Sequence, residues 1–118
     1  MKNANEETAV ILQAESSEAV NNIAEIVKLE GVDAILIGPY DLSASLGKPG
    51  EIDHPIVQSA IKEIIEACQN AKISMGIFGV SAEAVSPYKE KGFSLLTVGT
   101  DTAFLIDSAK IMLSRMNN

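Results

Sequence analysis

Residues 33–47 read DAILIGPYDLSASLG, and this stretch changes from apolar to polar within a few positions. Its first part, residues 33–38, is continuously apolar after Asp33 and predicts a buried strand. Gly38 and Pro39 then end the strand, and residues 41–46 predict a short helical turn. A buried strand that passes directly into a helical segment is typical of the βα unit of α/β proteins.

The same pattern occurs three more times along the chain. Further strands are predicted over residues 9–15, 73–80 and 93–99. Helical periodicity follows the strands, over residues 17–29, 55–69, 81–91 and 102–115, and the third of these contains Pro87, which removes one helical hydrogen bond. We therefore expect four βα units in one domain, residues 9–115, with polar tails at residues 1–8 and 116–118.

Strands joined by helical crossovers run parallel and keep one hand. Four units of about 30 residues amount to half of a (β/α)₈ barrel of roughly 250 residues, and an open doubly wound sheet is the other standard arrangement. Four strands alone leave two unpaired edges and an uncovered inner face. The expected inner residues, or their alternates along each strand, are Ile11, Ala34, Leu36, Ile77 and Leu96. Exposed apolar area of this kind predicts association with a second copy or another chain.

The composition excludes several classes of protein. Nine Lys and Arg residues against 16 Asp and Glu residues give the 118-residue chain a net charge of −7, which argues against binding to nucleic acid or anionic membranes. No apolar run approaches the roughly 20 residues that span a bilayer, and the first residues lack a signal-peptide pattern. Cys68 is the single cysteine, so an internal disulfide is excluded. We expect a cytoplasmic protein.

The residues that follow the strands are the candidates for chemistry, because ligands bind at the carboxyl ends of parallel strands. Gln13 and Glu15 are two positions apart and therefore point to the same side of the first strand. Unpaired N–H groups around residues 40–42 could hold a carboxylate or phosphate. Glu15 and Asp41 end neighbouring strands, so their carboxylates could share a hard divalent cation such as Mg²⁺ or Mn²⁺.

Ordinary structural roles explain the same residues as well. An Asp after Gly-Pro is most often a helix cap, and a Glu after a strand is often solvated. Ser43 and Ser45 are typical turn and cap residues. Thr100 and Asp101 most simply cap the last helix, and His54, the single histidine, most simply caps the helix that begins at Pro55.

Four segments resemble the HpcH/HpaI aldolase/citrate lyase family: LQAES at 12–16, LEGVDAILIGPYDLSASLG at 29–47, HP at 54–55 and VGTD at 98–101. The resemblance is greatest to the 2-oxo-acid aldolases of the 4-hydroxy-2-oxoheptanedioate and 2-keto-3-deoxy-sugar-acid type, and it covers nearly all of residues 9–115. It implies that the chain is the carboxyl-terminal half of a (β/α)₈ barrel, with Glu15 and Asp41 at the ends of strands five and six. Citrate lyase β-type members share the acidic pair, but the sequence motif DLSASLG favours the aldolases.

The resemblance also implies a metal-dependent, class II aldolase that cleaves 4-hydroxy-2-oxo acids to pyruvate and an aldehyde. Glu15 and Asp41 would bind the cation, which would be Mg²⁺, Mn²⁺ or Co²⁺. Gln13 would orient the 2-oxo acid, and the turn formed by Gly38, Pro39, Tyr40 and Asp41 would meet its carboxylate. The position of Tyr40 usually holds a small residue in the family, so its ring would crowd this site.

The catalytic residues themselves cannot be assigned from this chain, because the family's catalytic base belongs to the preceding half of the barrel. His54 matches a different, noncatalytic histidine of the family. Two hypotheses therefore stand: an aldolase completed by a homo-oligomer or by an amino-terminal half-barrel, or a noncatalytic half-barrel that retains metal and 2-oxo-acid binding.

Overall fold

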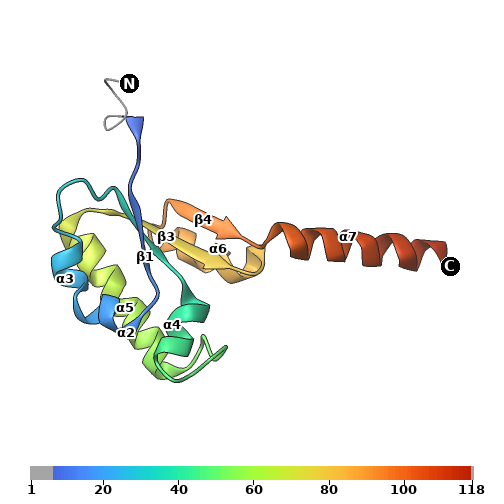
Figure 1. Ribbon diagram of the computed structural model, residues 1–118, viewed down its shortest axis with the longest axis horizontal. Helices are drawn as coiled ribbons and strands as arrows, with labels where there is room; N and C mark the ends of the chain where they lie inside the picture. The colour runs from blue at the N-terminus through green and yellow to red at the C-terminus, as the bar shows by residue number, and fades with distance from the viewer. Residues whose placement is uncertain (1–6, 118) are drawn as a thin grey trace.

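The computed structural model describes residues 7–117, and in that part of the chain four strands form one parallel sheet in the order β1-β2-β3-β4. The strands are β1 (Ile11–Ala14), β2 (Ala34–Ile37), β3 (Ser74–Gly79) and β4 (Leu95–Val98). The helices are α2 (Ser17–Asn21), α3 (Ile23–Ile26), α4 (Pro39–Ser45), α5 (Pro55–Ala71), α6 (Ala82–Glu90) and α7 (Asp101–Met116). The predicted α/β class and the βα alternation are confirmed (Figure 1).

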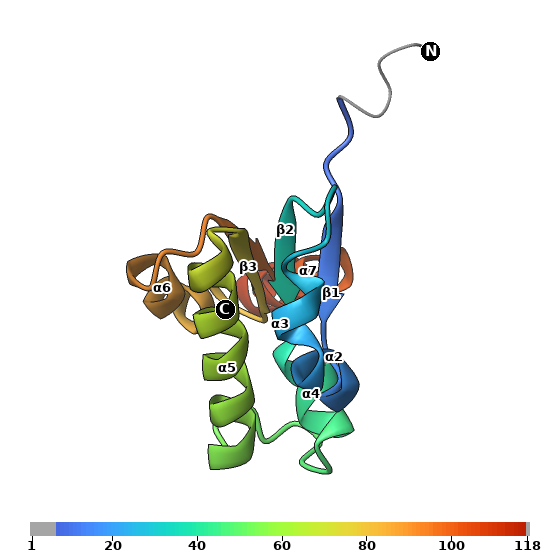
Figure 2. The ribbon, with the colours of Figure 1, turned by 90° about the vertical axis from the view of Figure 1, so that its left-hand side faces the viewer.

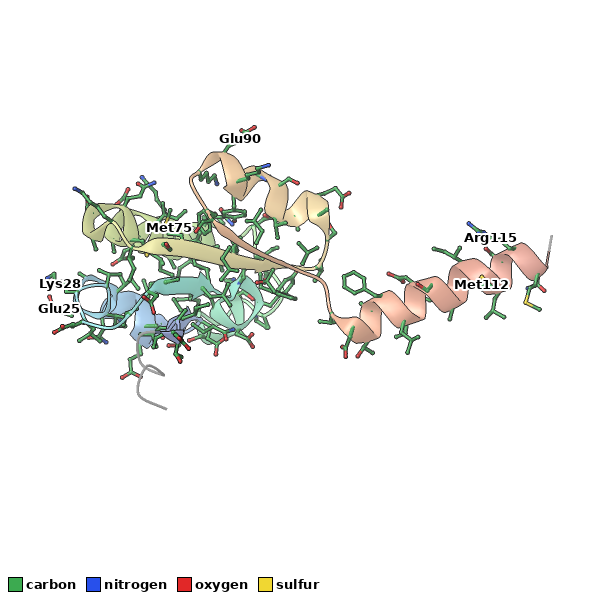
Figure 3. All side chains as sticks on the ribbon, turned by 90° about the horizontal axis from the view of Figure 1, so that it is seen from above. Glu25, Lys28, Met75, Glu90, Met112 and Arg115 are labelled. Atoms are coloured by element: carbon green, nitrogen blue, oxygen red, sulfur yellow. The ribbon has the colours of Figure 1, made fainter. Side chains whose placement is uncertain are left out.

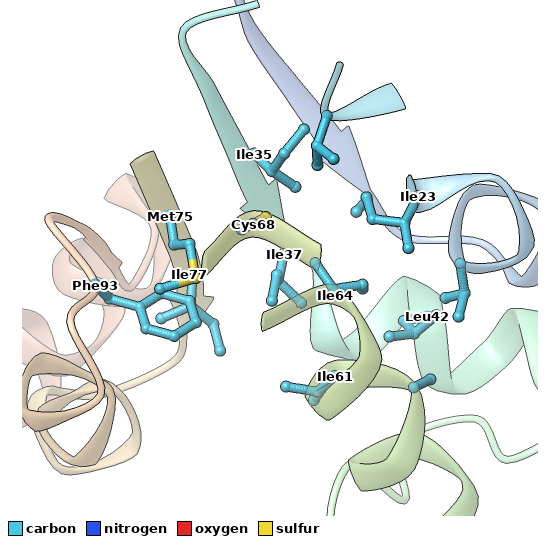
Figure 4. Packing of buried hydrophobic residues seen from close by; sticks show 14 of the residues in the cluster. Ile23, Ile35, Ile37, Leu42, Ile61, Ile64, Cys68, Met75, Ile77 and Phe93 are labelled. Atoms are coloured by element: carbon cyan, nitrogen blue, oxygen red, sulfur yellow. The ribbon is translucent and has the colours of Figure 1, made fainter. Parts of the chain in front are cut away.

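The helices α2, α3, α5 and α6 lie on one side of the sheet (Figure 2). α5 packs on β3, α6 packs on β3 and β4, and both α2 and α3 contact α5. The core lies between these two layers, and isoleucine is its most frequent residue (Figure 4). Its fully buried members include Ile35 and Ile37 of β2, Ile77 of β3 and Ile64 of α5. Each such side chain contributes about 1.5–3 kcal/mol through burial.

The predicted helix over residues 17–29 is two short helices rather than one. The backbone at Asn22 leaves the helical region, with φ −107° and ψ 4°. Its side-chain amide donates to the Glu18 carbonyl at 2.8 Å. The Asn22 backbone N–H donates to the same carbonyl at 3.1 Å, so the break lies in the backbone angles at Asn22 and not in the loss of this helical bond. The prediction of a continuous helix was therefore wrong, although Ile23 and Val27 are both buried.

The strand register decides which side chains face the helices. Ala14, Ile37, Ile77 and Leu96 form one row across the sheet, and Gln13, Leu36, Gly76 and Leu95 form the adjacent row. Side chains of adjacent rows point to opposite faces. The first row faces the helices, so on β3 and β4 the alternates Gly76 and Leu95, and not Ile77 and Leu96, lie on the inner face. Ala34 pairs with Ile11 and lies on the inner face as expected, but it is buried and not exposed. Continuous apolar strands do not reveal which alternate residues face the helices, and the register supplies that information.

The face opposite the helices bears Gln13, Leu36 and Leu95, and no described helix covers it. Gln13 and Ile11 are exposed, and Leu36 and Leu95 are half-buried. In a complete barrel this face would point inward. The sheet therefore has the expected form of an open half-barrel with β1 and β4 as its edges.

α7 is the one described helix that extends away from the sheet (Figures 1 and 3). Thr100 caps it by accepting from the Ala103 N–H at 3.2 Å, as expected from the sequence. Every side chain in the helix is exposed, including Leu105 at 72% and Met112 at 60%. These two residues are seven positions apart and lie on one stripe. An apolar stripe without a partner favours association.

The expected tail at residues 1–8 lies outside the described residues except for its last two positions, and residue 118 of the second tail is also outside them. No helix in residues 7–117 is both long and apolar enough to cross a membrane.

We expect the isolated chain to associate in solution, because the open sheet face and the stripe on α7 both expose apolar surface. Sedimentation velocity at increasing concentration should show species larger than the monomer. Leu105→Lys combined with Met112→Lys should reduce association while the circular dichroism spectrum is retained. A single monomer boundary at all concentrations, with cooperative unfolding, would contradict this expectation.

Cys68 provides a probe of the core because its side chain is fully buried on α5. Burial raises the pKa of its thiol from 9.0 to about 11. The unfolded chain releases this proton near pH 9 and the folded chain near pH 11, so stability should fall as pH rises through that range. At mildly alkaline pH a thiol reagent should label Cys68 slowly until denaturant is added. Rapid labelling of the folded chain would contradict the described core.

Candidate functional site

The candidate residues gather where β1 and β2 end. Ala14 pairs with Ile37, and the Gly38 N–H donates to the Ala14 carbonyl at 3.2 Å, which extends the pairing by one residue. Glu15 follows Ala14 directly and therefore lies beside Gly38. The structure thus brings together the two sequence segments that carry the predicted metal ligands.

Gln13 and Glu15 both lie against Gly38. A Cβ atom at Gly38 would lie 3.2 Å from Nε2 of Gln13 and 3.2 Å from Oε2 of Glu15. The φ angle of Gly38 is −103°, so the backbone itself would accept another residue. A methyl group at Gly38 would be tightly packed against the two polar side chains, which would have to shift by a few tenths of an ångström.

α4 begins immediately after this contact and carries Asp41 in its first turn. The first N–H groups of a helix have no intrahelical acceptor. Pro39 has no N–H and Gly38 has no side chain to cap the helix, so the N–H groups of Tyr40 and Asp41 are available to a ligand. Asp41 is exposed, while Leu42 is fully buried and anchors the helix to the core.

Tyr40 packs against Phe78 of β3. The two rings meet edge to face, with centroids 6.3 Å apart and planes at 71°. Phe78 follows Ile77, the register partner of Ile37, and is therefore next to Gly38 across the sheet. Phe78 is half-buried, and its ring is the contact that holds the ring of Tyr40 at the start of α4.

A hollow of about 360 Å³ lies next to Tyr40, between α5 and α6. Tyr88 lines it, and burial raises the pKa of the Tyr88 hydroxyl, with the Asp53 carboxylate acting in the same direction and a hydrogen bond with Gln58 opposing them. Tyr88 therefore stays a neutral donor at ordinary pH. Two of the predicted substrate-binding residues, Pro39 and Tyr40, also line this hollow, whereas Glu15 and Asp41 do not.

The serines of the DLSAS segment take specific positions. Ser43 is fully buried; its hydroxyl donates to the Tyr40 carbonyl at 2.6 Å and accepts from the Gly50 N–H at 3.0 Å. Ser45 accepts from the Ser17 N–H at 2.9 Å, a bond between residues 28 positions apart. The sequence indicated only turn and cap roles, because nothing in it shows that these two segments meet.

His54 caps α5 as expected, since its Nδ1 accepts from the Ile56 N–H at 3.3 Å. It is the single histidine of the chain and is engaged away from Glu15 and Asp41. Among residues 7–117 no group of three or more His, Cys, Asp or Glu side chains is placed to hold a metal. The structure places Gln13 and Glu15 against Gly38, and it places Asp41, exposed, in the first turn of the helix that follows. These hard oxygen donors fit Mg²⁺ or Mn²⁺, which commonly take one or two protein carboxylates and fill the remaining positions with water or substrate oxygens.

Comparison with known proteins gives a consistent result. Residues 1–108 match the family model described as HpcH/HpaI aldolase/citrate lyase. A 4-hydroxy-2-oxo-heptane-1,7-dioate aldolase of Shigella flexneri is 36% identical over 118 residues, which cover all of this chain and 44% of that protein. The chain thus spans less than half the length of this relative.

Solved structures agree in fold and in coverage. An HpcH/HpaI aldolase/citrate lyase family protein from Burkholderia cenocepacia J2315 superposes with a TM-score of 0.92 at 36% identity, covering 99% of this chain and 46% of that one. An HpcH/HpaI aldolase from Desulfitobacterium hafniense DCB-2 gives 0.89 at 28% identity, with the same two coverages. Four parallel βα units of this chain therefore match about half of each of these structures.

We expect Gly38→Ala to displace Gln13 and Glu15 by a few tenths of an ångström, because the added methyl group would occupy the space between them. Metal affinity should fall by about 3-fold to 10-fold, and thermal stability should change little because both side chains are free to move toward solvent. Titration with Mn²⁺, followed by calorimetry, would measure this change.

Gly79→Ala is the matched control, since its Cβ would lie 2.5 Å from Cγ1 of the buried Val85. That variant should lower thermal stability without altering the residues of the site. Equal Mn²⁺ affinity of Gly38→Ala and the parent chain would show that the Gly38 contact does not shape the site.

Proposed function

Because the chain belongs to the HpcH/HpaI aldolase/citrate lyase family, we propose that it forms the metal-binding half of a class II aldolase that cleaves 4-hydroxy-2-oxo acids to pyruvate and an aldehyde. The observation that carries this proposal is the contact of Gln13 and Glu15 with Gly38, directly before the helix that bears Asp41. We propose that the Asp41 carboxylate joins Glu15 and Gln13 there, next to the N–H groups at the start of α4.

In this proposal Glu15 and Asp41 hold a divalent cation, Mg²⁺, Mn²⁺ or Co²⁺, through their carboxylate oxygens. When bound, the cation supplies positive charge next to the keto group of the 2-oxo acid, which stabilises the negative charge that develops on its oxygen. The N–H groups of Tyr40 and Asp41 receive the carboxylate of the 2-oxo acid, and the Gln13 amide orients it. Gly38 and Pro39 shape the turn without blocking the approach.

The ring of Tyr40 limits the size of the site. It is held by the edge-to-face contact with Phe78 and so stays at the start of α4. A small 2-oxo acid such as pyruvate fits this restriction better than a larger one. We therefore place the narrow, pyruvate end of the substrate at Tyr40 and the aldehyde end farther out.

The general base comes from outside this chain in our proposal. His54, the single histidine, already accepts a hydrogen bond at the start of α5. The uncovered sheet face and the two edge strands offer a surface where an amino-terminal half-barrel, or a second copy of this chain, would close the barrel. Such closure would bring further side chains to the same mouth as Glu15.

A noncatalytic role is the second candidate. The chain spans 44% of the Shigella flexneri relative, and the half that it matches leaves the base unassigned. A half-barrel of this kind would bind the cation and a 2-oxo acid without turning over substrate. The two candidates share the metal site and differ only in catalysis.

We expect the parent chain to bind Mn²⁺, and Glu15→Gln and Asp41→Asn each to weaken that binding at least tenfold, because each variant removes one charged oxygen donor. With the metal present, the methyl protons of pyruvate should exchange slowly with deuterium, and the exchange should be lost in Asp41→Asn. Calorimetric titration and proton NMR provide the two measurements.

Glu83→Gln, on the first turn of α6, is the control and should behave as the parent does. Retro-aldol turnover by the chain alone should be at least about a thousandfold below that of a full-length relative, since a base and positioning groups are each worth ~10² or more. Restored turnover on adding an amino-terminal half-barrel would support the aldolase, and metal binding without restoration would favour the noncatalytic role. Unchanged Mn²⁺ affinity in both acidic variants would contradict the site.

A further inference from the structure

The two chain segments that carry the acidic pair are joined at two points. At one point the Gly38 N–H donates to the Ala14 carbonyl at 3.2 Å. At the other the Ser17 N–H donates to Oγ of Ser45 at 2.9 Å. Glu15 lies between the two bonds on its segment, and Asp41 lies between them on the other. The bonds and segments therefore form a closed loop that contains both carboxylates.

Ser45 is placed to make the second bond by the geometry of α4. It is four residues after Asp41, and residues at this spacing share one face of a helix. Ser17 is two residues after Glu15 and is the first residue of α2, where an N–H has no intrahelical acceptor. The face of α4 that bears Asp41 is thus the face held against the connection that bears Glu15.

We propose that Ser45 is a positioning residue that fixes the separation of Glu15 and Asp41 through its bond to the Ser17 N–H. The inference rests on the proposed metal site. The Ser45 hydroxyl also donates to Oγ of Ser17 at 3.4 Å, as part of the same contact. Without this contact the two segments would be joined here by the Ala14–Gly38 hydrogen bond, and α4 could turn about that point. Like charges repel, so in the absence of a cation the two carboxylates favour such an opening. The second bond opposes it.

The bond is exposed to water, so its effect on metal affinity should be moderate. Holding two ligands in place raises affinity by reducing the ordering that must occur on binding. Loss of Ser45 should therefore weaken Mn²⁺ binding without abolishing it, in contrast to loss of either carboxylate. This difference in size separates a positioning residue from a ligand.

The bond can be removed from either side with little effect on the helices. Ser45→Ala removes the acceptor, and alanine has the highest helix propensity. Ser17→Pro removes the donor, and proline is well accepted at the first position of a helix. Ser16 already has the extended backbone that precedes a proline, with φ −135° and ψ 156°. Both variants should therefore keep the fold.

Two further variants serve as controls. Ser45→Thr retains a hydroxyl at the same position and should rescue the effect. Ser86→Ala removes a hydroxyl that donates to the Ala82 carbonyl within its own helix, α6, and that bond links no two segments. It measures the effect of losing an exposed serine hydroxyl as such.

The experiment measures Mn²⁺ affinity by calorimetry on the full 118-residue chain and its variants. Ser45→Ala and Ser17→Pro should each weaken Mn²⁺ binding by about 3-fold to 10-fold. The double variant should bind Mn²⁺ about as well as the single variant of lower affinity, because both changes remove the same contact. Ser45→Thr and Ser86→Ala should match the parent. Unchanged affinity in Ser45→Ala, or fully additive losses in the double variant, would overturn the proposal.

Amide hydrogen exchange without metal gives a second, independent measurement. The Ser17 amide should exchange slowly in the parent and in Ser45→Thr, and several-fold faster in Ser45→Ala. If the parent binds no Mn²⁺, the proposed function is overturned, and exchange at Ser17 alone decides whether Ser45 joins the two segments. Equal exchange in the parent and Ser45→Ala would overturn the positioning role even if Mn²⁺ binds.

Discussion

The packing of α5 against β2 and β3 is the interaction on which the rest of this chain depends. Ile64 and Cys68 of α5 are fully buried, and Ile37 and Ile77 of the two central strands are 1% exposed. α2 and α3 contact α5, and α4 contacts both α5 and β3. The same packing fixes the level at which β2 ends, and therefore where Gly38 and α4 begin.

This arrangement covers one face of the sheet and leaves the other uncovered. The side chains of the helix-facing row pack in the hydrophobic core. The opposite row, which includes Gln13 and Leu36, is not covered by a helix. Gln13, the polar residue of that row, lies next to the candidate site, because Gln13 and Glu15 are on the same side of β1. In a complete barrel the inward face of the sheet packs against the other strands, and the site lies at the carboxyl ends of the same strands. The uncovered face and the candidate site therefore adjoin each other.

The site itself is built from short connections held by hydrogen bonds rather than from regular structure. α4 has seven residues and would be marginal alone, but the buried Leu42 fixes it to the core, and the Gly50 N–H bond to Ser43 joins it to the loop that follows. The contact of Glu15 with Gly38 and the bond of Ser45 to Ser17 then place the two acidic segments against each other. The ring of Tyr40, at the start of α4, packs against Phe78 of β3.

The amino-acid sequence by itself determined the succession of βα units, the short helix after Gly38-Pro39, the caps at His54 and Thr100, and membership of the family, because each depends on residues close together along the chain. It did not determine the break at Asn22, the helix-facing side of β3, or the direction of α7. Nor did it reveal the bond between Ser17 and Ser45. Those features depend on the register of neighbouring strands and on contacts between segments far apart in sequence, and only the tertiary structure brings such segments together.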